Sequence, residues 1–214
     1  MADDTGTRTV SLGAQDLEGF LGLPAAARGL VVFAHGAGSS RFSARNRFVA
    51  NRLEASRLAT LLFDLLSEEE ATDRANVFDI PLLAGRMVEA LDWVATRDDL
   101  KDLPVGLFGS STGAAAALVA AAQAPERVSA VVSRGGRPDL AGSALSKVEC
   151  PTLLIVGGAD YQVLELNREA LDRLSCEKRL DVVPGATHLF EEPGTLEQVA
   201  ELAASWFTGH LGSD

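Results

Sequence analysis

The chain has 214 residues, of which 47% are hydrophobic and 23% charged, a balance typical of one globular domain, which we expect to span residues 1–214. Its formal net charge of −11 would repel nucleic acid and anionic membranes, so we expect neither as a partner. Cys150 and Cys176 are the only cysteines, too few for a metal cluster or a disulfide framework.

The first ten residues, MADDTGTRTV, are polar and acidic. They lack the basic start and the apolar stretch of a secretory signal. The longest run of small apolar residues, 114–122, is far shorter than the ~20 residues that a membrane-spanning helix needs. We therefore expect a cytoplasmic protein.

Short apolar runs alternate with longer amphipathic or alanine-rich segments along the rest of the chain. Residues 7–12 and 17–21 flank a Gly-Ala-Gln-Asp turn and predict a hairpin. Further strands are predicted at residues 30–34, 60–63, 105–108, 128–133, 152–156 and 179–183. Helices are predicted at 48–58, 80–96, 112–124, 163–174 and 196–207, and the acidic stretch 67–76 is read as an exposed loop leading into a helix.

This alternation predicts an α/β fold. Strands separated by helices form right-handed crossovers, so the sheet is expected to be mostly parallel with helices on both faces. The predicted architecture is a three-layer αβα sandwich with an N-terminal antiparallel hairpin and no cap domain. Only about 17 residues separate the strands that end near 133 and begin at 152, where a cap would be inserted. We therefore expect an open or shallow site at the carboxyl ends of the strands.

The clearest chemical motif is Gly-Ser-Ser-Thr-Gly at residues 109–113, which fits G-x-S-x-G with Ser111 at its centre. A strand precedes it and a helix follows, as a sharp turn that exposes the serine hydroxyl requires. The alternatives are a tight turn before a close-packed helix, or a phosphate-binding loop. The segment lacks both the GxGxxG spacing and the lysine of a Walker loop.

A serine hydroxyl needs a base to become a good nucleophile. His188 follows the last predicted strand, in the order that a nucleophile–acid–histidine triad requires. Asp160, directly after LLIVGGA, is the predicted acid that would orient the imidazole. Asp64 and Asp139 are its rivals, but Asp64 precedes Ser111 and breaks the expected order.

The segment His-Gly-Ala-Gly at residues 35–38 follows another buried-looking run. We expect the backbone N–H groups of Ala37 and Thr112 to face the negative charge that develops on a substrate carbonyl oxygen. For His35 itself, a structural role is favoured.

Two groups of arginines are candidates for binding an anionic part of a substrate. Arg134 and Arg137 lie just past the carboxyl end of a strand, and one of them could hold a substrate carboxylate or phosphate. The second group follows the HGAG segment and comprises Arg41, Arg45, Arg47 and Arg52. Surface salt bridges are the alternative reading for both groups.

Taken together, HGAG at 35–38, GSSTG at 109–113, LLIVGGAD at 153–160 and GATH at 185–188 resemble the α/β-hydrolase superfamily. The resemblance is to its small lidless members related to dienelactone hydrolase, although those enzymes use a cysteine nucleophile where this chain has serine. It implies a triad of Ser111, Asp160 and His188, with Ala37 and Thr112 as oxyanion donors.

The expected activity is hydrolysis of a small ester or thioester through an acyl-enzyme, with no metal and no cofactor. Two alternatives stay open. One is an acyltransferase that uses the same acyl-enzyme, and the other is a non-catalytic binding module with a hydrolase fold.

Overall fold

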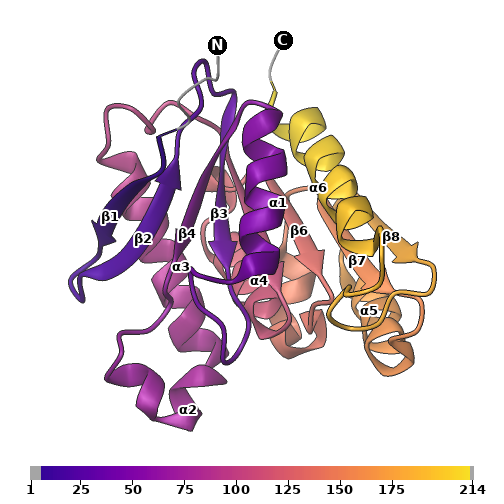
Figure 1. Cartoon of the computed structure of the whole chain (residues 1–214). Coiled ribbons are helices and arrows are strands. Elements are labelled where there is room, and N and C mark those ends of the chain that lie inside the picture. Colours follow the sequence, from indigo (N-terminus) through magenta and orange to yellow (C-terminus); the bar gives the residue numbers. More distant parts are fainter. Residues whose placement is uncertain (1–5, 213–214) are drawn as a thin grey trace.

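The computed structural model describes residues 6–212; the start of the acidic amino-terminal segment, residues 1–5, and residues 213–214 lie outside the described residues. The described chain is built on one eight-stranded sheet with the order β1-β2-β4-β3-β5-β6-β7-β8 (Figure 1). The strands are β1 (Arg8–Leu12), β2 (Leu17–Gly22), β3 (Gly29–Ala34), β4 (Leu58–Phe63), β5 (Val105–Ser110), β6 (Ala130–Arg134), β7 (Thr152–Gly157) and β8 (Lys178–Val183). From β4 to β8 across the sheet, all neighbours pair in parallel, whereas β1–β2 and β2–β4 are antiparallel. This is the predicted α/β fold with its N-terminal hairpin.

Helices cover both faces of the sheet. The α-helices are α1 (Ala44–Ala55), α2 (Arg74–Val77), α3 (Ile80–Ala95), α4 (Thr112–Gln123), α5 (Tyr161–Arg173) and α6 (Thr195–Leu211), with 3₁₀ helices η1 (Glu70–Thr72), η2 (Pro125–Arg127) and η3 (Pro138–Lys147). Figure 1 shows α1 and α6 on one face, with α3, α4 and α5 behind the sheet. These are the three layers that the sequence predicts.

The strands divide their side chains between two cores. In β3, Leu30 and Val32 pack toward the core that contains α3 and α4. Val31 and Phe33 point the other way, into the core under α1 and α6, where the Phe33 and Phe108 rings lie 4.8 Å apart. Successive side chains of a strand face opposite sides of the sheet. A continuous apolar run is therefore what a strand covered on both faces requires.

Helix α4 packs closely because most of its side chains are alanine. Residues from Thr112 to Leu118 are all buried, and so are Ala120 and Ala121. A helix that is apolar all round belongs in the interior. Its small side chains allow α4 to lie close to both α3 and the sheet, which holds the turn at residues 109–113 in place.

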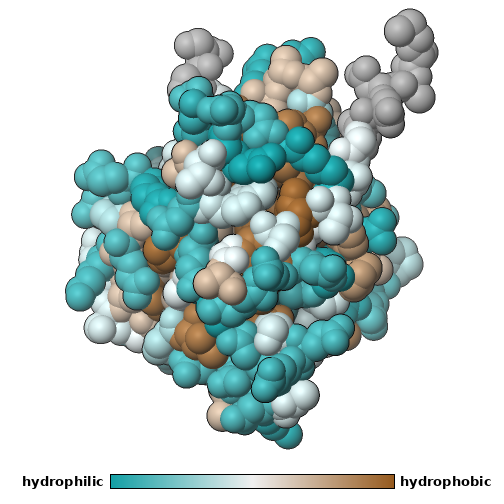
Figure 2. All heavy atoms as spheres, turned by 90° about the vertical axis from the view of Figure 1, so that its left-hand side faces the viewer, coloured by the Kyte–Doolittle hydropathy of each residue, from teal (hydrophilic) through white to brown (hydrophobic). Residues whose placement is uncertain are grey.

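The β1–β2 hairpin forms one edge of the sheet. Its turn has positive φ at Gly13 and Asp16, with values of 68° and 50°. Arg8 of the edge strand pairs with Asp99, and charged side chains on an edge strand oppose the addition of a further strand. Figure 2, which views the molecule from this side, shows a mostly hydrophilic surface with separate apolar patches.

The prediction for the segment 48–58 was partly wrong. The first helix ends at Ala55, and Leu58 is the first residue of β4 instead of a helical residue. The physical reason is Arg57, whose φ of 62° is incompatible with helix continuation. Phe48, counted toward the apolar stripe of the helix, is exposed.

The connection between β6 and β7 contains only η3, which packs against α4 and α5, so no separate cap is present in the described chain. Within residues 6–212, no helix is both long enough and apolar enough to cross a bilayer.

Candidate active site

Ser111 occupies a strained turn between β5 and α4. Its backbone has φ 51° and ψ −125°, a conformation that non-glycine residues rarely adopt. The turn is held by its neighbours, since the Ser111 carbonyl accepts hydrogen bonds from the N–H groups of Ala114 at 3.2 Å and Arg137 at 2.9 Å. Strain of this kind persists only where the surrounding structure imposes it, and it is concentrated at functional sites.

The glycines around this turn are required by close backbone packing. A Cβ atom on Gly109 would lie under 3.0 Å from the backbone of Ala114, and one on Gly113 under 3.0 Å from the carbonyl oxygens of Ala34 and His35. Gly36 of the HGAG loop approaches from the other side, where a Cβ would lie 2.8 Å from the Cβ of Ser111. The two glycines of G-x-S-x-G therefore allow α4 to begin directly against the end of β3.

The structure brings His188 and Asp160 together. Nδ1 of His188 lies 2.6 Å from Oδ2 of Asp160, although 28 residues separate them in the chain. The carboxylate is mostly shielded, with 15% of its side chain exposed, while the imidazole is 39% exposed. An ionised carboxylate only accepts hydrogen bonds, so this contact favours the tautomer with the proton on Nδ1 and leaves Nε2 as the acceptor.

Ser111 and the His188–Asp160 pair lie at the same end of the sheet. The Ser111 N–H faces the Arg134 carbonyl oxygen at 3.4 Å, and the next residue, Gly135, lies beside His188. A Cβ on Gly135 would be 3.7 Å from Nδ1 of His188. In the described part of the chain, no hydrogen bond joins the Ser111 hydroxyl to the imidazole. Catalytic hydrogen bonds often form only when substrate is bound.

The two rival carboxylates are engaged elsewhere. Asp64 accepts the Arg41 backbone N–H at 2.6 Å and pairs with the Arg41 guanidinium. Asp139 forms two hydrogen bonds with the Arg137 guanidinium, at 2.8 and 2.7 Å. Of the three candidate carboxylates, Asp160 is the one at the imidazole.

The HGAG loop contacts the first residue of α4. The Ala37 N–H donates to the Thr112 hydroxyl at 2.9 Å. The two predicted donors therefore come from adjacent segments, but the Ala37 N–H already has a side-chain acceptor. The Thr112 N–H lies in the first turn of α4, where backbone N–H groups have no partner within the helix.

His35 ties this loop to the end of β4. Its Nδ1 lies 3.0 Å from the Gly36 carbonyl oxygen, and its Nε2 lies 3.0 Å from the Leu65 backbone nitrogen. Nδ1–H therefore donates and Nε2 accepts, which is the neutral ring. This arrangement agrees with the structural role expected from the sequence.

The partly buried position of His35 predicts a pH dependence of stability. Burial lowers the pKa of His35 below its ordinary value of 6.5, against weaker opposing effects of the Gly36 carbonyl and Asp64. Below pH about 6.5, His35 therefore binds a proton in the unfolded chain but stays neutral in the folded chain. The free energy of unfolding therefore falls as the pH is lowered. We expect urea unfolding between pH 7.5 and 5 to show that the free energy of unfolding declines more steeply with falling pH for the wild type than for His35→Gln. Equal slopes would contradict a neutral His35 ring with a lowered pKa, because the other two histidines are present in both proteins.

Most of the candidate arginines form ion pairs. Arg41 pairs with Asp64 and Glu18, Arg45 with Glu191 at 3.3 Å, and Arg52 with Glu201 at 2.8 Å. For these residues, as for Arg137, the salt-bridge reading is supported. Arg134 differs: it is 8% exposed, and it is the last residue of β6, paired in register with Ser110.

A cavity of about 690 Å³ opens beside the HGAG loop, within the range of small-molecule sites. Gly36 lines it and also contacts Ser111, so the cavity adjoins the strained turn. Its other lining residues include Leu17, Glu18, Arg41, Phe42, Asp64, Leu65, Leu66, Glu68, Ala71 and Val77. This lining includes none of Ser111, Thr112, Asp160 and His188, so the cavity lies next to the strained turn and is reached from it through Gly36.

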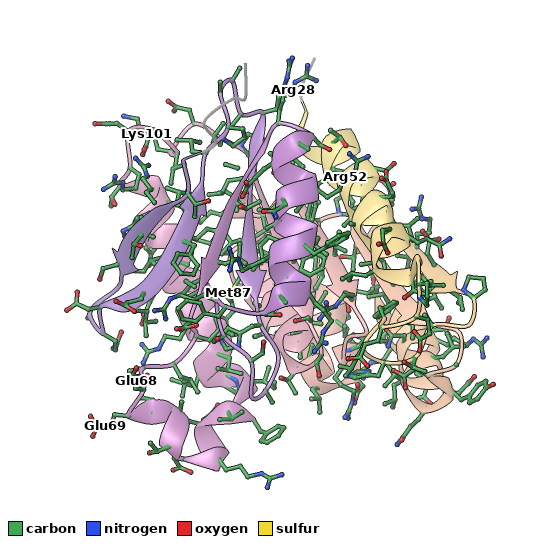
Figure 3. All side chains as sticks on the ribbon, in the orientation of Figure 1. Arg28, Arg52, Glu68, Glu69, Met87 and Lys101 are labelled. Atoms are coloured by element: carbon green, nitrogen blue, oxygen red, sulfur yellow. The ribbon has the colours of Figure 1, made fainter. Side chains whose placement is uncertain are left out.

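The acidic stretch 67–76 supplies part of the cavity wall. Ser67, Glu68 and Ala71 line the cavity, whereas the sequence predicts only an exposed loop leading into a helix here. Figure 1 shows α2 beyond the end of the sheet where the parallel strands finish, and Figure 3 shows Glu68 and Glu69 beside it. The charge run correctly indicated an exposed surface, but it carried no signal of the cavity behind it.

Two supporting residues of the histidine loop were not identified from the sequence. Glu192 accepts hydrogen bonds from the Thr187 N–H at 3.1 Å and from the Thr187 hydroxyl at 2.6 Å, which fixes the loop on both sides of His188. A Cβ on Gly157 would lie under 3.0 Å from the Ala186 carbonyl oxygen, so β7 approaches this loop closely. The paired glycines in LLIVGGAD were the available signal for that approach.

Comparisons with known proteins agree with this architecture. Residues 27–203 match the family model described as an α/β hydrolase domain. The solved structure of a dienelactone hydrolase from Anabaena variabilis is 56% identical, with a TM-score of 0.92 over 96% of this chain and 97% of that one. Est1E from Butyrivibrio proteoclasticus shares the fold, with 16% identity and a TM-score of 0.79 over 96% of this chain and 98% of its own.

A putative phosphoribosyl transferase of Mycobacterium tuberculosis H37Rv is 61% identical over 202 residues. The match covers 94% of this chain but only 46% of that protein, so the chain spans about half the length of this curated relative. Both the family model and the similarity to the dienelactone hydrolase cover most of the present chain. The chain therefore belongs to the α/β hydrolase domain family.

Proposed function

We propose that the chain is a serine hydrolase that cleaves small ester or thioester substrates through an acyl-enzyme. The observation that carries the proposal is the strained Ser111 at the end of the sheet where His188 lies 2.6 Å from Asp160. Family membership supports a hydrolase-type enzyme. The residue roles follow from this geometry and from the chemistry that each side chain can perform.

In the proposed reaction, Ser111 Oγ attacks the substrate carbonyl carbon while His188 Nε2 takes its proton. Asp160 holds the ring through Nδ1 and stabilises the imidazolium. The carbonyl oxygen becomes an oxyanion beside the N–H groups of Thr112 and Ala37. For Ala37 to donate, the Thr112 hydroxyl must yield its place to the oxyanion or share the N–H with it.

Collapse of the tetrahedral intermediate breaks the bond to the alcohol or thiol, which leaves with the proton from His188. His188 then removes a proton from water, and the resulting hydroxide attacks the acyl-enzyme. Breaking the acyl–Ser111 bond releases the acid and returns the proton to the serine. The cavity beside Gly36 would accept one substituent of the ester, in a space lined by Leu17, Leu65 and Val77.

Turnover of a panel of p-nitrophenyl esters and acyl thioesters tests this proposal. We expect release of the free acid, and a reduction in kcat of about 10³- to 10⁴-fold in Asp160→Asn, because an uncharged amide favours the wrong tautomer. Asp139→Asn is the control, since that carboxylate pairs with Arg137. Equal activity of wild type and Asp160→Asn would contradict the assigned role.

The same assays separate the alternatives. An acyltransferase would give acylated product in preference to free acid when alcohol or amine acceptors are added. A binding module would release no acid from any member of the panel. The name of the mycobacterial relative refers to a protein of which this chain covers under half, and nothing in the described site favours phosphoribosyl transfer over acyl chemistry.

A further inference from the structure

Arg134 is a buried cation without a counterion in the described chain. It is 8% exposed, and its Nε and Nη1 atoms are buried with no hydrogen-bond partner. No carboxylate of residues 6–212 lies within ion-pair distance of it. Arg86, which is also buried, pairs instead with both Glu70 and Glu89.

The surroundings of Arg134 are electrostatically unfavourable for a cation. Burial, and then the positive charge of nearby Arg45, lower the pKa of Arg134 to about 10. A guanidinium still carries its charge at neutral pH with this pKa. Leaving a buried charge unpaired costs free energy, which an anion placed against the guanidinium would recover.

The position of Arg134 connects it to the proposed nucleophile. Arg134 pairs in register with Ser110 on the neighbouring parallel strand, and its carbonyl oxygen faces the Ser111 N–H. Neighbouring strands lie about 5 Å apart, so the Arg134 side chain starts beside the residue that precedes the proposed nucleophile. Val132, two residues earlier, packs in the core under α1 and α6, so the Arg134 side chain faces that layer.

The cavity beside the HGAG loop has a different charge pattern. Its arginine, Arg41, is already neutralised by Asp64 and Glu18, and Glu68 adds another negative charge to the wall. An anionic substituent would be repelled there. Arg134, by contrast, faces the layer of α1 and α6 and has no carboxylate partner among residues 6–212.

We propose that Arg134 forms a subsite that binds an oxyanion group of the substrate while Ser111 attacks the ester. The group is a carboxylate or a phosphate, whose oxygens match the parallel N–H donors of a guanidinium. The proposal rests on the proposed hydrolase activity and adds the class of substrate to it: an ester or thioester whose second functional group is an anion.

Two matched esters test the subsite. One is the mono-p-nitrophenyl ester of glutaric acid, and the other is the same compound with its free carboxylate methylated. We expect the wild type to prefer the anionic ester. Arg134→Met should lower kcat/KM for the anionic ester by about 10- to 100-fold, which is the effect of losing a charged hydrogen bond. Its kcat/KM for the methylated ester should stay within about threefold of the wild-type value. Arg52→Met, which alters the exposed face of α1, is the control and should not change the preference (Figure 3).

A measurement on the wild type covers the case in which Arg134→Met does not fold. Glutarate and inorganic phosphate should inhibit hydrolysis of the methylated ester competitively, and the tighter inhibitor distinguishes a carboxylate-bearing from a phosphate-bearing substrate. The subsite would be overturned if neither anion inhibits. It would also be overturned if a folded Arg134→Met loses kcat/KM equally for the two esters. In those cases, if the wild type still hydrolyses the methylated ester, the hydrolase proposal stands. If the wild type hydrolyses no ester, both the hydrolase proposal and the subsite proposal are overturned.

Discussion

Replacing Ser111 with glycine is expected to abolish ester turnover and to stabilise the fold relative to Ser111→Ala. Both variants remove the hydroxyl, so each should lose about 10⁴-fold or more in kcat. Alanine keeps the Cβ atom and therefore the cost of φ 51° and ψ −125°, while glycine adopts positive φ freely. Strain of this kind costs about 1–3 kcal/mol, and the entropy of glycine in the unfolded chain offsets part of the relief.

Urea unfolding should therefore show Ser111→Gly to be about 1 kcal/mol more stable than Ser111→Ala, a difference of about 2–4 °C in Tm for a chain of this size. Equal stabilities would contradict the view that the turn is strained at this residue. Residual turnover near the wild-type level in either variant would contradict the role of Ser111 as nucleophile.

The second large effect is expected at Gly113. A Cβ at this position would lie under 3.0 Å from the backbone oxygens of Ala34 and His35, which no side-chain rotation relieves. In Gly113→Ala, α4 must move away from the end of β3. We expect a loss of about 3 kcal/mol in the free energy of unfolding. Activity should also fall because the start of α4 carries Ser111 and Thr112.

Gly85→Ala is the matched control for this substitution. Gly85 lies within α3, and a Cβ there would meet no atom within 4 Å. The substitution is therefore expected to raise the free energy of unfolding by about 0.5–1 kcal/mol, the helix-propensity difference between the two residues. Thermal or urea unfolding of both variants measures the contrast. Similar stabilities of the two variants would contradict the close approach of α4 to β3.

The fold was predictable because its signals are local and repeated. The run Leu30–Ala34 predicts a strand buried on both faces, and its side chains do divide between the two cores. Boundaries were less predictable where a single backbone conformation decides them. Arg57 ends the first helix through a positive φ, which its sequence context does not reveal.

For the candidate site too, some features were predictable from the sequence and others were not. Chain order favours Asp160 over Asp64 as the partner of His188, and in the structure the Asp160 and His188 side chains are in contact. Contacts between distant residues left no comparable signal. The hydrogen bond from Ala37 to the Thr112 hydroxyl joins residues 75 positions apart. The lack of a counterion for Arg134 among residues 6–212 likewise depends on every residue that packs around it, which no motif encodes.

Labelling with a fluorophosphonate, followed by mass-spectrometric mapping of the adduct, tests most directly whether one activated alcohol lies at the end of the sheet. The reagent reacts quickly only with a serine whose proton is removed by a neighbouring base. We expect a single adduct on Ser111, none in Ser111→Ala, and slower labelling in Asp160→Asn. An unlabelled protein, or an adduct on Ser110 or another residue in place of Ser111, would contradict a triad built from Ser111, His188 and Asp160.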